Sequence, residues 1–505
     1  MKRLIITGLI ISLGLSSQAQ MQTSYKAETF GSAATGEHTP FWMVNHNWGT
    51  VSAEANNFYL RGGVFHEQKL NKDWSFDAGI DVIAGNKANY GKAWIQQLYG
   101  RINWKIFRLD AGMRENYTAL FDPYLSSGDM TQSNNARPLP QIWAGIPEFW
   151  LVPYTRGQFF VKGEVSVGKY LDGQWQENTA RPYYRSYVQN VLSHHKSIYF
   201  RFGDMKNRHK QQFTVGMTQD AQWGGDFYTT TYSLNADGEW QKQYDYFAKK
   251  HGLREFIAIC LAQGGEGGVS AMDRSFISGS HWGSYILKYD YKWSENIFLS
   301  AYLQHFFEDG TGMGWFNYPD NLYGLSFHSK EKTWLSGAVA EVLYTKHQSG
   351  PIHIATDLDA EHYDDYFFYS TGNDNYYNNE EYRQGPSHFG KSMGTPLLLS
   401  PEYNNDGSLN FQNNRVIAFH LGAEGYLYPS LQYRLLLTHG QGWGRFYHPF
   451  TSVKKGFASQ LEVIYTCQKF EGLSAKLSIG CDTGEFFGGK TFGGGISIRK
   501  EGRLF

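Results

Sequence analysis

Two pairs of adjacent side chains have the chemistry of catalytic groups. Glu308 and Asp309 are neighbouring carboxylates, and His194 and His195 are neighbouring imidazoles. A glycosidase needs two carboxyl groups that face each other across a sugar ring, and neighbours in a turn rarely do so. Adjacent residues of a β-strand point to opposite faces, so the two histidines are not expected to act together. The sequence therefore predicts no catalytic residue and favours a structural use of the histidines.

Few residues have the types and spacing of metal ligands. The run from Asp357 to Asp365 offers carboxylate oxygens for Ca²⁺, but it lacks the glycine turn and the ligand order of a calcium loop. Cys260, Cys467 and Cys481 match no zinc spacing, because the closest two are 14 positions apart. We therefore expect free thiols, no metal and no cofactor. We expect the acidic run at 357–365 to be a solvated loop, and a cation site there is the alternative.

The segment from 357 to 414 has a composition that suits a carbohydrate ligand. Aromatic rings pack on the C–H face of a pyranose, while amides and carboxylates form hydrogen bonds with its hydroxyl groups. An alternative is that tyrosine and asparagine merely fill a long loop. The candidate glycan-binding residues are Tyr363, Asp364, Asp365, Tyr366, Asn373, Asp374, Asn375, Tyr376, Tyr377 and Asn378.

Composition and the amino terminus limit the class of protein that carries these residues. A formal net charge of −1 gives no basic surface for a nucleic-acid backbone. Lys2 and Arg3 precede an apolar run, and Ser17 and Ala19 are small residues at the positions that a signal peptidase reads. We expect residues 1–19 to be a cleaved signal peptide and the protein to be exported.

Alternation of apolar with polar or small residues recurs along the rest of the chain. This period of two predicts an all-β protein whose strands have one apolar and one wet face. A soluble sandwich or propeller would share it, but apolar positions ending in aromatic residues and long polar insertions favour a transmembrane antiparallel β-barrel. The clearest segments are 74–82, 107–114, 161–167, 198–203, 285–292, 460–468 and 473–482.

Chain length sets the size of this barrel. Spanning strands need about 9–11 residues each, so about 16–18 strands fit into residues 20–505 as a single domain with room for long insertions. Residues 244–261 break the strand rhythm and predict an amphipathic helix at one mouth of the barrel, which we place on the periplasmic side. A loop followed by one more strand is the alternative.

Five blocks of sequence, taken in order, resemble the Wzi capsule-assembly family. They include residues 39–42 near the amino terminus and a block at 372–379 and 394–397 that resembles the late loop of the Bacteroidetes branch. The positions that match family motifs are Ser133, Asn135, Arg137, Pro138, His195, Lys196, Glu308 and Asp309.

This resemblance implies both a fold and a function. The family's fold is an outer-membrane barrel of about 18 strands with a small periplasmic helical bundle. Its function is that of a non-enzymatic surface lectin that helps assemble and attach capsular or exopolysaccharide at the Gram-negative cell surface. The expected partners are that polysaccharide and outer-membrane lipid, with the protein a monomer that binds no nucleic acid. The alternatives are an outer-membrane channel or porin for small solutes or glycans, and an outer-membrane hydrolase.

Overall fold

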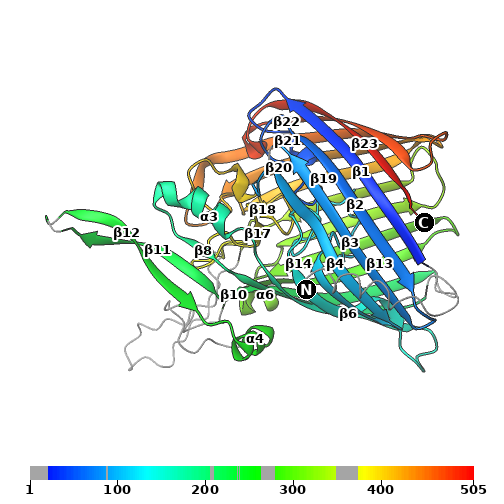
Figure 1. The fold of residues 1–505 in the computed structure, drawn as a ribbon, viewed down its shortest axis with the longest axis horizontal. Helices are drawn as coiled ribbons and strands as arrows, with labels where there is room; N and C mark the ends of the chain where they lie inside the picture. The colour runs from blue at the N-terminus through cyan, green and yellow to red at the C-terminus, as the bar shows by residue number, and fades with distance from the viewer. Residues whose placement is uncertain are drawn as a thin grey trace, which may run out of the picture.

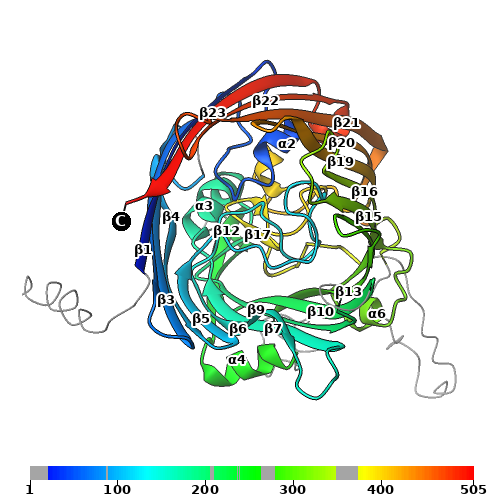
Figure 2. The ribbon, with the colours of Figure 1, turned by 90° about the vertical axis from the view of Figure 1, so that its right-hand side faces the viewer.

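The structure, a computed structural model, is a closed β-barrel (Figure 2). It describes residues 21–86, 89–204, 210–235, 237, 239–262, 279–348 and 374–504. The expected signal peptide, residues 1–19, therefore lies outside the described residues. Eighteen strands form the barrel: β1 (Met21–Ala34), β2 (Phe58–Lys69), β3 (Trp74–Gly85), β4 (Ala93–Trp104), β5 (Phe107–Met113), β6 (Gln141–Leu151), β7 (Phe159–Lys169), β9 (Leu192–Phe202), β10 (Gln211–Trp223), β13 (Ser280–Lys292), β14 (Ile297–Phe307), β15 (Asn321–Ser329), β16 (Gly337–Tyr344), β19 (Val416–Tyr428), β20 (Leu431–Gly444), β21 (Pro449–Thr466), β22 (Leu473–Thr483) and β23 (Thr491–Arg503).

Every barrel strand pairs antiparallel with its neighbours. β1 pairs with β2 on one side and with β23 on the other, which closes the barrel and leaves neither strand as an edge. Inserted elements interrupt the sequence order at three places, where β7 pairs with β9, β10 with β13 and β16 with β19. The predicted all-β transmembrane fold with 16–18 strands is confirmed.

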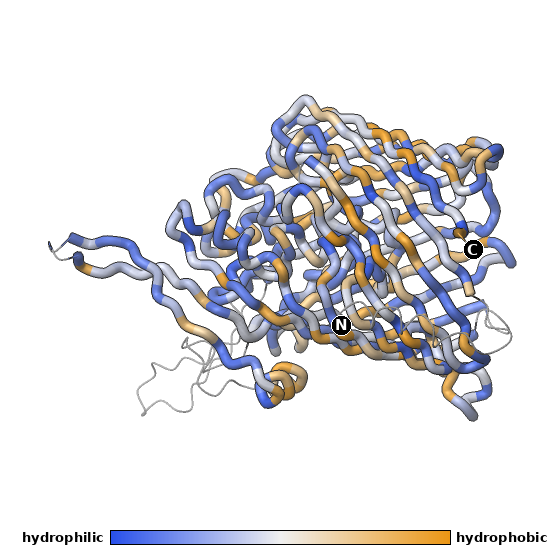
Figure 3. The backbone as a smooth tube through the Cα atoms, in the orientation of Figure 1, coloured by the Kyte–Doolittle hydropathy of each residue, from blue (hydrophilic) through white to orange (hydrophobic). Residues whose placement is uncertain are grey.

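Burial along the strands is inverted relative to a soluble protein. On β3, Ile80 and Val82 are exposed, whereas Asp81 is fully buried. The same holds around the barrel: hydrophobic and hydrophilic residues alternate along the strands (Figure 3), and the large apolar strand residues are exposed where the charged ones are buried. Arg61 of β2 bonds Asp81 at 2.5 Å and Glu115 at 2.8 Å inside the barrel. An apolar outside and a polar inside are the features of a barrel that stands in the outer membrane.

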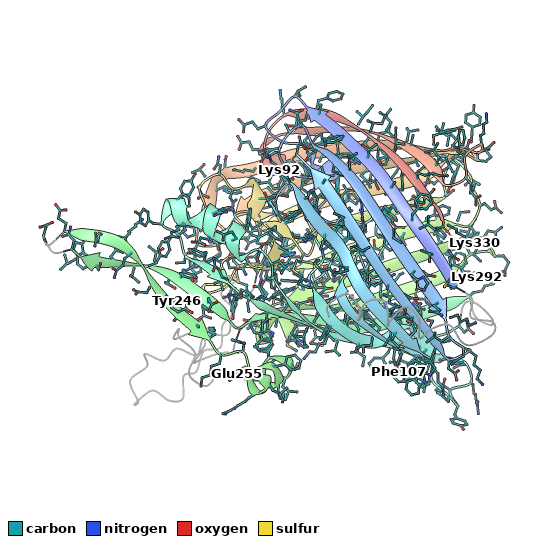
Figure 4. The ribbon with its side chains drawn as sticks, viewed as in Figure 1. Lys92, Phe107, Tyr246, Glu255, Lys292 and Lys330 are labelled. Carbon is teal, nitrogen blue, oxygen red and sulfur yellow. The ribbon has the colours of Figure 1, made fainter. Side chains whose placement is uncertain are left out.

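The two ends of the barrel differ in the length of their connections. The carboxyl terminus lies at the end with short turns, such as 70–73 and 429–430, and Lys292 and Lys330 lie at the same end (Figure 4). Long connections gather at the opposite end, where Tyr246 lies (Figures 1 and 4). In outer-membrane barrels the short turns face the periplasm and the long loops face outward. We call the two ends the short-turn end and the loop end.

Three of the long connections fold back into the lumen. We define these residues, 35–57, 114–140 and 374–415, as the plug. The first contains α2 (Phe41–Val44), in which Trp42 Nε1 donates to Thr438 Oγ1 of β20 at 2.9 Å. The third contains the short strands β17 (Ser387–His388) and β18 (Lys391–Ser392) and η3 (Pro401–Tyr403). Buried aromatic and aliphatic residues of the plug and of the inner wall form the largest hydrophobic core of the molecule.

A second sheet stands outside the barrel at the loop end. It consists of β8 (Tyr187–Gln189), β11 (Gly225–Leu234) and β12 (Trp240–Lys249), in the order β12–β11–β8. The hairpin β11–β12 extends away from the barrel (Figure 1), with α3 (Gly173–Ala180) and η1 (Arg181–Tyr183) near its base. The short helices α6 (Gly310–Met313) and η4 (Glu485–Phe487) lie in the β14–β15 and β22–β23 connections.

The helix predicted at 244–261 is shorter than expected and lies at the other end. Residues 244–249 belong to β12, because Tyr244 and Tyr246 alternate with polar residues and pair with β11. The helix α4 covers only Leu253–Cys260, after Gly252 donates its N–H to Glu255 Oε2 at 2.9 Å. It packs on the outside of the wall at the loop end, not on the periplasmic side (Figures 1 and 2). None of the helices among the described residues is long and apolar enough to cross a bilayer.

Candidate functional site

The predicted glycan-binding residues divide into two groups. Tyr363, Asp364, Asp365, Tyr366 and Asn373 lie outside the described residues. Tyr376 and Tyr377 are buried in the plug, at 0 % and 1 % exposure. Tyr376 Oη donates to Asp320 at 2.9 Å, and Tyr377 Oη donates to the carbonyl of Met130. The prediction that these two tyrosine rings are available to a sugar is therefore corrected, because both rings are buried and both hydroxyl groups form hydrogen bonds that stabilise the plug.

The other described candidates also bond within the plug. Asn378 exchanges two hydrogen bonds with the backbone of Phe411, at 3.0 and 2.8 Å. Asn375 Oδ1 accepts from Asn414 Nδ2 at 2.8 Å. Asp374 is 8 % exposed, and burial together with Asp309 and Asp320 raises its pKa to about 9. From 374 onward the segment is a packed insert and not a projecting loop.

The carboxylates Glu308 and Asp309 do not converge on a shared substrate position. Glu308 Oε1 accepts the N–H of Tyr377 at 2.7 Å, and burial beside Asp374 raises the pKa of Glu308 well above its usual range. Asp309 caps α6 by accepting the N–H groups of Thr311 and Gly312. The pair is thus used in folding the β14–β15 connection. The described residues contain no group of three or more His, Cys, Asp or Glu side chains that would hold a metal ion.

The motif residues of the 133–138 block connect different segments of the plug to one another and connect the plug to the barrel wall. Ser133 Oγ donates to the carbonyl of Gly394 at 2.8 Å, and Asn135 Nδ2 donates to that of Ser392 at 3.0 Å. Arg137 Nη2 donates to the carbonyl of Ile95 on β4 at 2.6 Å, and Pro138 is buried beside it. Each of these contacts joins residues far apart in sequence, so the block positions plug segments against each other and against the wall.

The adjacent histidines point to opposite sides of the wall, as predicted. His195 lies in the lumen, with Nδ1 3.0 Å from Asp220 and Nε2 3.2 Å from Glu164. His194 faces outward and is covered by Phe256 of α4. Lys196 also faces outward, and its ammonium group donates to the carbonyl of Cys260 at the end of α4. These two outward polar groups are thereby shielded from the lipid zone by the helix.

One face of the three-stranded sheet collects aromatic residues. Residues two apart on a strand share a face, and the pairing aligns Tyr228 with Tyr246, Thr230 with Tyr244 and Leu234 with Trp240. Near the base the rings pack on each other, with Tyr187 and Tyr228 stacked at 4.8 Å. Tyr232 and Trp240, toward the tip, are open to solvent at 63 % and 70 % exposure, and Tyr246, which pairs with Tyr228 near the base, is 60 % exposed. We call this set the aromatic face: Tyr187, Tyr228, Tyr232, Trp240, Tyr244 and Tyr246.

A cleft of about 260 Å³ opens near the base of the aromatic face. It brings together residues from the connection between η1 and β8, from β11 and from the plug, which are distant in sequence. Its lining residues are Tyr184, Arg185, Ser186, Thr230, Arg383, Ser408, Leu409 and Asn410. Tyr184 stacks parallel to Tyr244 at 6.4 Å, which makes the cleft continuous with the aromatic face.

A second cavity, of about 310 Å³, lies in the lumen. Barrel residues and the amino-terminal part of the plug line it, and its charged lining includes Lys26, Glu28, Arg61, Glu115, Arg434 and Glu462. Most of these charges are already paired: Arg434 bonds Glu462 at 2.7 Å and Arg499 bonds Glu28 at 2.9 Å. The cavity is polar and occupies the wet interior that the sequence predicts.

The sequence analysis did not identify the aromatic face or the cleft. One local signal for the hairpin was available: Tyr228, Thr230 and Tyr232 alternate with polar residues before Asp237-Gly238, a dipeptide typical of tight hairpin turns. No such signal exists for the cleft, because Arg185 and Arg383 come together only through the folded plug.

Comparison with known proteins gives matches of fold. No family model matches the sequence, and no curated protein matches it. Among solved structures, Wzi, an outer membrane protein involved in group 1 capsule assembly in Escherichia coli and described as a carbohydrate-binding β-barrel, has a TM-score of 0.53 at 12 % identity over 94 % of this chain and 83 % of Wzi. OccD1 (OprD) has a TM-score of 0.47 at 7 % identity over 96 % of each chain. OmpF of Salmonella typhi, solved with daunomycin, has a TM-score of 0.39 at 8 % identity over 95 % of this chain and 97 % of OmpF.

The structural likeness to Wzi concerns the barrel as a whole. It agrees with the outer-membrane barrel of about 18 strands that the resemblance to the capsule-assembly family implied. The small periplasmic helical bundle that it also implied is not found among the described residues, whose short helices lie in the plug or at the loop end. At 12 % identity the structural likeness assigns no site.

Proposed function

We propose that the protein is a non-enzymatic outer-membrane lectin of the Wzi type, in its Bacteroidetes branch, which binds capsular or exopolysaccharide at the loop end of the barrel. The observation that carries the proposal is the aromatic face, in which the rings of Tyr232, Trp240 and Tyr246 are open to solvent on a sheet that extends away from the wall. The resemblance of five sequence blocks to the capsule-assembly family supports the same function.

The geometry suits a polymer more than a small ligand. Aromatic rings two residues apart on paired strands form a row, along which consecutive sugars can stack. Each contact is weak, and many contacts made at once hold a repeating chain firmly. Tyr363, Asp364, Asp365, Tyr366 and Asn373 are proposed as further contacts from the segment before the plug.

The plug fills the lumen of the barrel, which suits a protein that retains a polymer at the cell surface. Plug and wall share a hydrophobic core, and buried contacts such as Phe41 N to Asp482 Oδ2, at 2.6 Å, fix one to the other. A barrel filled in this way is suited to holding a polymer at its outer end. The proposal includes a monomer in contact with outer-membrane lipid, exported by cleavage after residue 19, with no nucleic-acid partner and no cofactor.

A channel for small solutes or glycans is the second candidate. The observation that favours it is the charged lumen cavity of about 310 Å³. Single-channel conductance separates the two functions, because a lectin with a seated plug gives no steady ion current, whereas a channel gives one.

Binding of the purified protein to polysaccharide from the same cell surface tests the proposal. The detergent-solubilised mature barrel is expected to bind that polysaccharide selectively, with dextran as an unrelated neutral glycan for comparison. Absence of binding by a folded barrel, together with a steady ion current, would overturn the lectin function in favour of the channel.

A further inference from the structure

Three arginines lie at or beside the cleft at the base of the aromatic face. Arg185 and Arg383 line it. Arg445, from the connection between β20 and β21, lies next to the lining residue Asn410, close enough for the charges of Arg383 and Arg185 to act on it. With the side-chain amide of Asn410 turned so that both its atoms find partners, Nδ2 donates to the backbone carbonyl of Arg383 at 2.9 Å and Oδ1 accepts from Arg445 Nη1 at 3.3 Å. In this orientation Asn410 links the backbone at Arg383 to the guanidinium of Arg445. We call Arg185, Arg383 and Arg445 the arginine cluster.

Positive charge in the cluster exceeds the negative charge that the fold supplies. Asp406 is bonded to Arg185 at 2.9 Å, and this pair is half exposed. Among the described residues, no carboxylate lies within ion-pair distance of Arg383 or Arg445, and Glu380 acts on Arg383 only at longer range. Three cations therefore share one closely bonded carboxylate.

The cations are also partly removed from water. Burial lowers the pKa of Arg445, and the charges of Arg383 and Arg185 lower it further, while Asp406 raises it. Arg445 Nε is buried without a hydrogen-bond partner. A buried guanidinium normally has its donors satisfied, since an unpaired charged donor costs free energy. The cluster is thus a built cationic site with unused donors.

A planar anion is the ligand that this geometry recognises best. A guanidinium presents two parallel N–H donors that match the two oxygens of a carboxylate. Tyr184, which also lines the cleft, is 53 % exposed and can pack its ring against a ligand there. The cleft volume of about 260 Å³ is below the range for drug-sized ligands, about 300–1,000 Å³, and suits a single sugar unit of a longer chain.

We infer that the cleft binds an acidic sugar unit, a uronic acid or another sugar with a carboxylate, of the polysaccharide that passes along the aromatic face. Arg383 and Arg445 take the carboxylate, Arg185 exchanges its bond to Asp406 for one to the sugar, and Tyr184 packs on the sugar ring. This inference rests on the proposed function and narrows its substrate class from polysaccharides in general to acidic ones.

Charge removal on either side of the contact tests the inference. The full mature chain is measured against polysaccharide from the same cell surface, in its native form and after chemical reduction of its carboxyl groups to alcohols. The variants are Arg383→Gln, Arg445→Gln and Arg185→Gln. Arg181→Gln is the matched control, because it removes the same charge from η1, where Arg181 bonds Glu177 and does not line the cleft.

The expected results form a simple pattern. Arg383→Gln and Arg445→Gln each lower the affinity for native polysaccharide at least tenfold, which corresponds to about 1.4 kcal/mol. Carboxyl reduction lowers the affinity of the wild-type protein by a similar factor, and it has no further effect on these variants. Arg181→Gln stays within twofold of wild type. Binding weakens with added salt, since it depends on charge.

Other outcomes separate this inference from the proposed function. Equal binding of native and reduced polysaccharide would overturn the acidic-sugar assignment and leave the lectin function standing. No binding of native polysaccharide by the folded wild-type barrel would overturn both. If Arg383→Gln and Arg445→Gln do not fold, as judged by thermal unfolding, the half-exposed Arg185→Gln and the reduced polysaccharide decide the matter alone.

Discussion

The plug and the outer sheet use similar residue types for opposite purposes. Tyr376 and Tyr377 of the plug have fully buried rings and internally bonded hydroxyl groups, whereas Trp240 and Tyr246 of the outer sheet are more than half exposed. Of the residues that resemble family motifs, Ser133, Asn135 and Arg137 lie in the plug and donate to backbone carbonyls. This comparison indicates that the motif block at 133–138 stabilises the interior of the barrel, whereas the exposed outer sheet contains none of the motif positions.

The largest effect is expected from breaking the plug itself. Glu341 of β16 accepts hydrogen bonds from Ser126 Oγ, Ser127 N and Tyr302 Oη at 2.5–2.7 Å. Glu341→Ala leaves these buried donors unpaired and should destabilise the plug by about 3 kcal/mol. Limited proteolysis should then cut residues 114–140 in a barrel that still migrates as folded. Glu295→Ala, at an 84 % exposed side chain, is the control and should leave the plug protected.

A second effect, on binding, is expected from the outer sheet. The double variant Trp240→Ala, Tyr246→Ala removes two exposed rings and should lower the affinity for surface polysaccharide about tenfold, or about 1.4 kcal/mol. Thermal unfolding should be unchanged, because neither ring belongs to the buried core. A variant that loses barrel stability but keeps its affinity would reverse the roles assigned to the two regions.

An effect of acid is expected in the plug. His388 Nδ1 lies 2.9 Å from the carbonyl of Arg137, and His388 Nε2 accepts the N–H of Leu171 at 3.2 Å. Burial lowers the pKa of His388 from 6.5 to about 3. The unfolded chain therefore protonates His388 between these values while the folded plug does not, so the contribution of His388 to plug stability is fully present above pH 6.5 and is lost as the pH falls toward 3.

Replacement of this histidine should reduce the acid sensitivity. Glutamine also offers one donor and one acceptor but does not titrate. His388→Gln is expected to cost about 1 kcal/mol or less at pH 8 and to flatten the loss of protease protection between pH 6.5 and 4. An unchanged pH profile would show that other groups, such as the buried His46, carry the effect.

The smallest effect is expected at the short-turn end. Trp293, in the turn between β13 and β14, is 64 % exposed, much like Trp240. Trp293→Ala should leave the affinity for polysaccharide within twofold of wild type, because this end of the barrel faces away from the aromatic face. A loss as large as that of the Trp240 variant would mean that ring exposure alone, without position, governs binding.

The barrel could be predicted from sequence because its signal is local. Alternation within single strands, as in 74–82, reports directly which side chains face lipid, and the outward Ile80 and Val82 confirm it. The opposite orientations of His194 and His195 follow from the same period. The three cysteines are free thiols, as expected.

The plug and the cleft could not be predicted in this way because they depend on distant contacts. The buried position of Tyr377 involves a hydrogen bond from its hydroxyl group to the backbone carbonyl of Met130, which is 247 positions away in sequence. Arg185 and Asp406 are 221 positions apart. Composition alone predicted that the tyrosine-rich segment 357–414 projects from the barrel. The described part of this segment, from residue 374 onward, instead packs into the lumen.

Affinity for surface polysaccharide, measured side by side for two variants and the wild-type protein, tests the central claim most directly. The account predicts that Trp240→Ala, Tyr246→Ala loses about tenfold in affinity, while His388→Gln at pH 8 stays within twofold of wild type. The reverse pattern, with affinity lost in the plug variant and kept in the hairpin variant, would contradict the assignment of binding to the outer sheet.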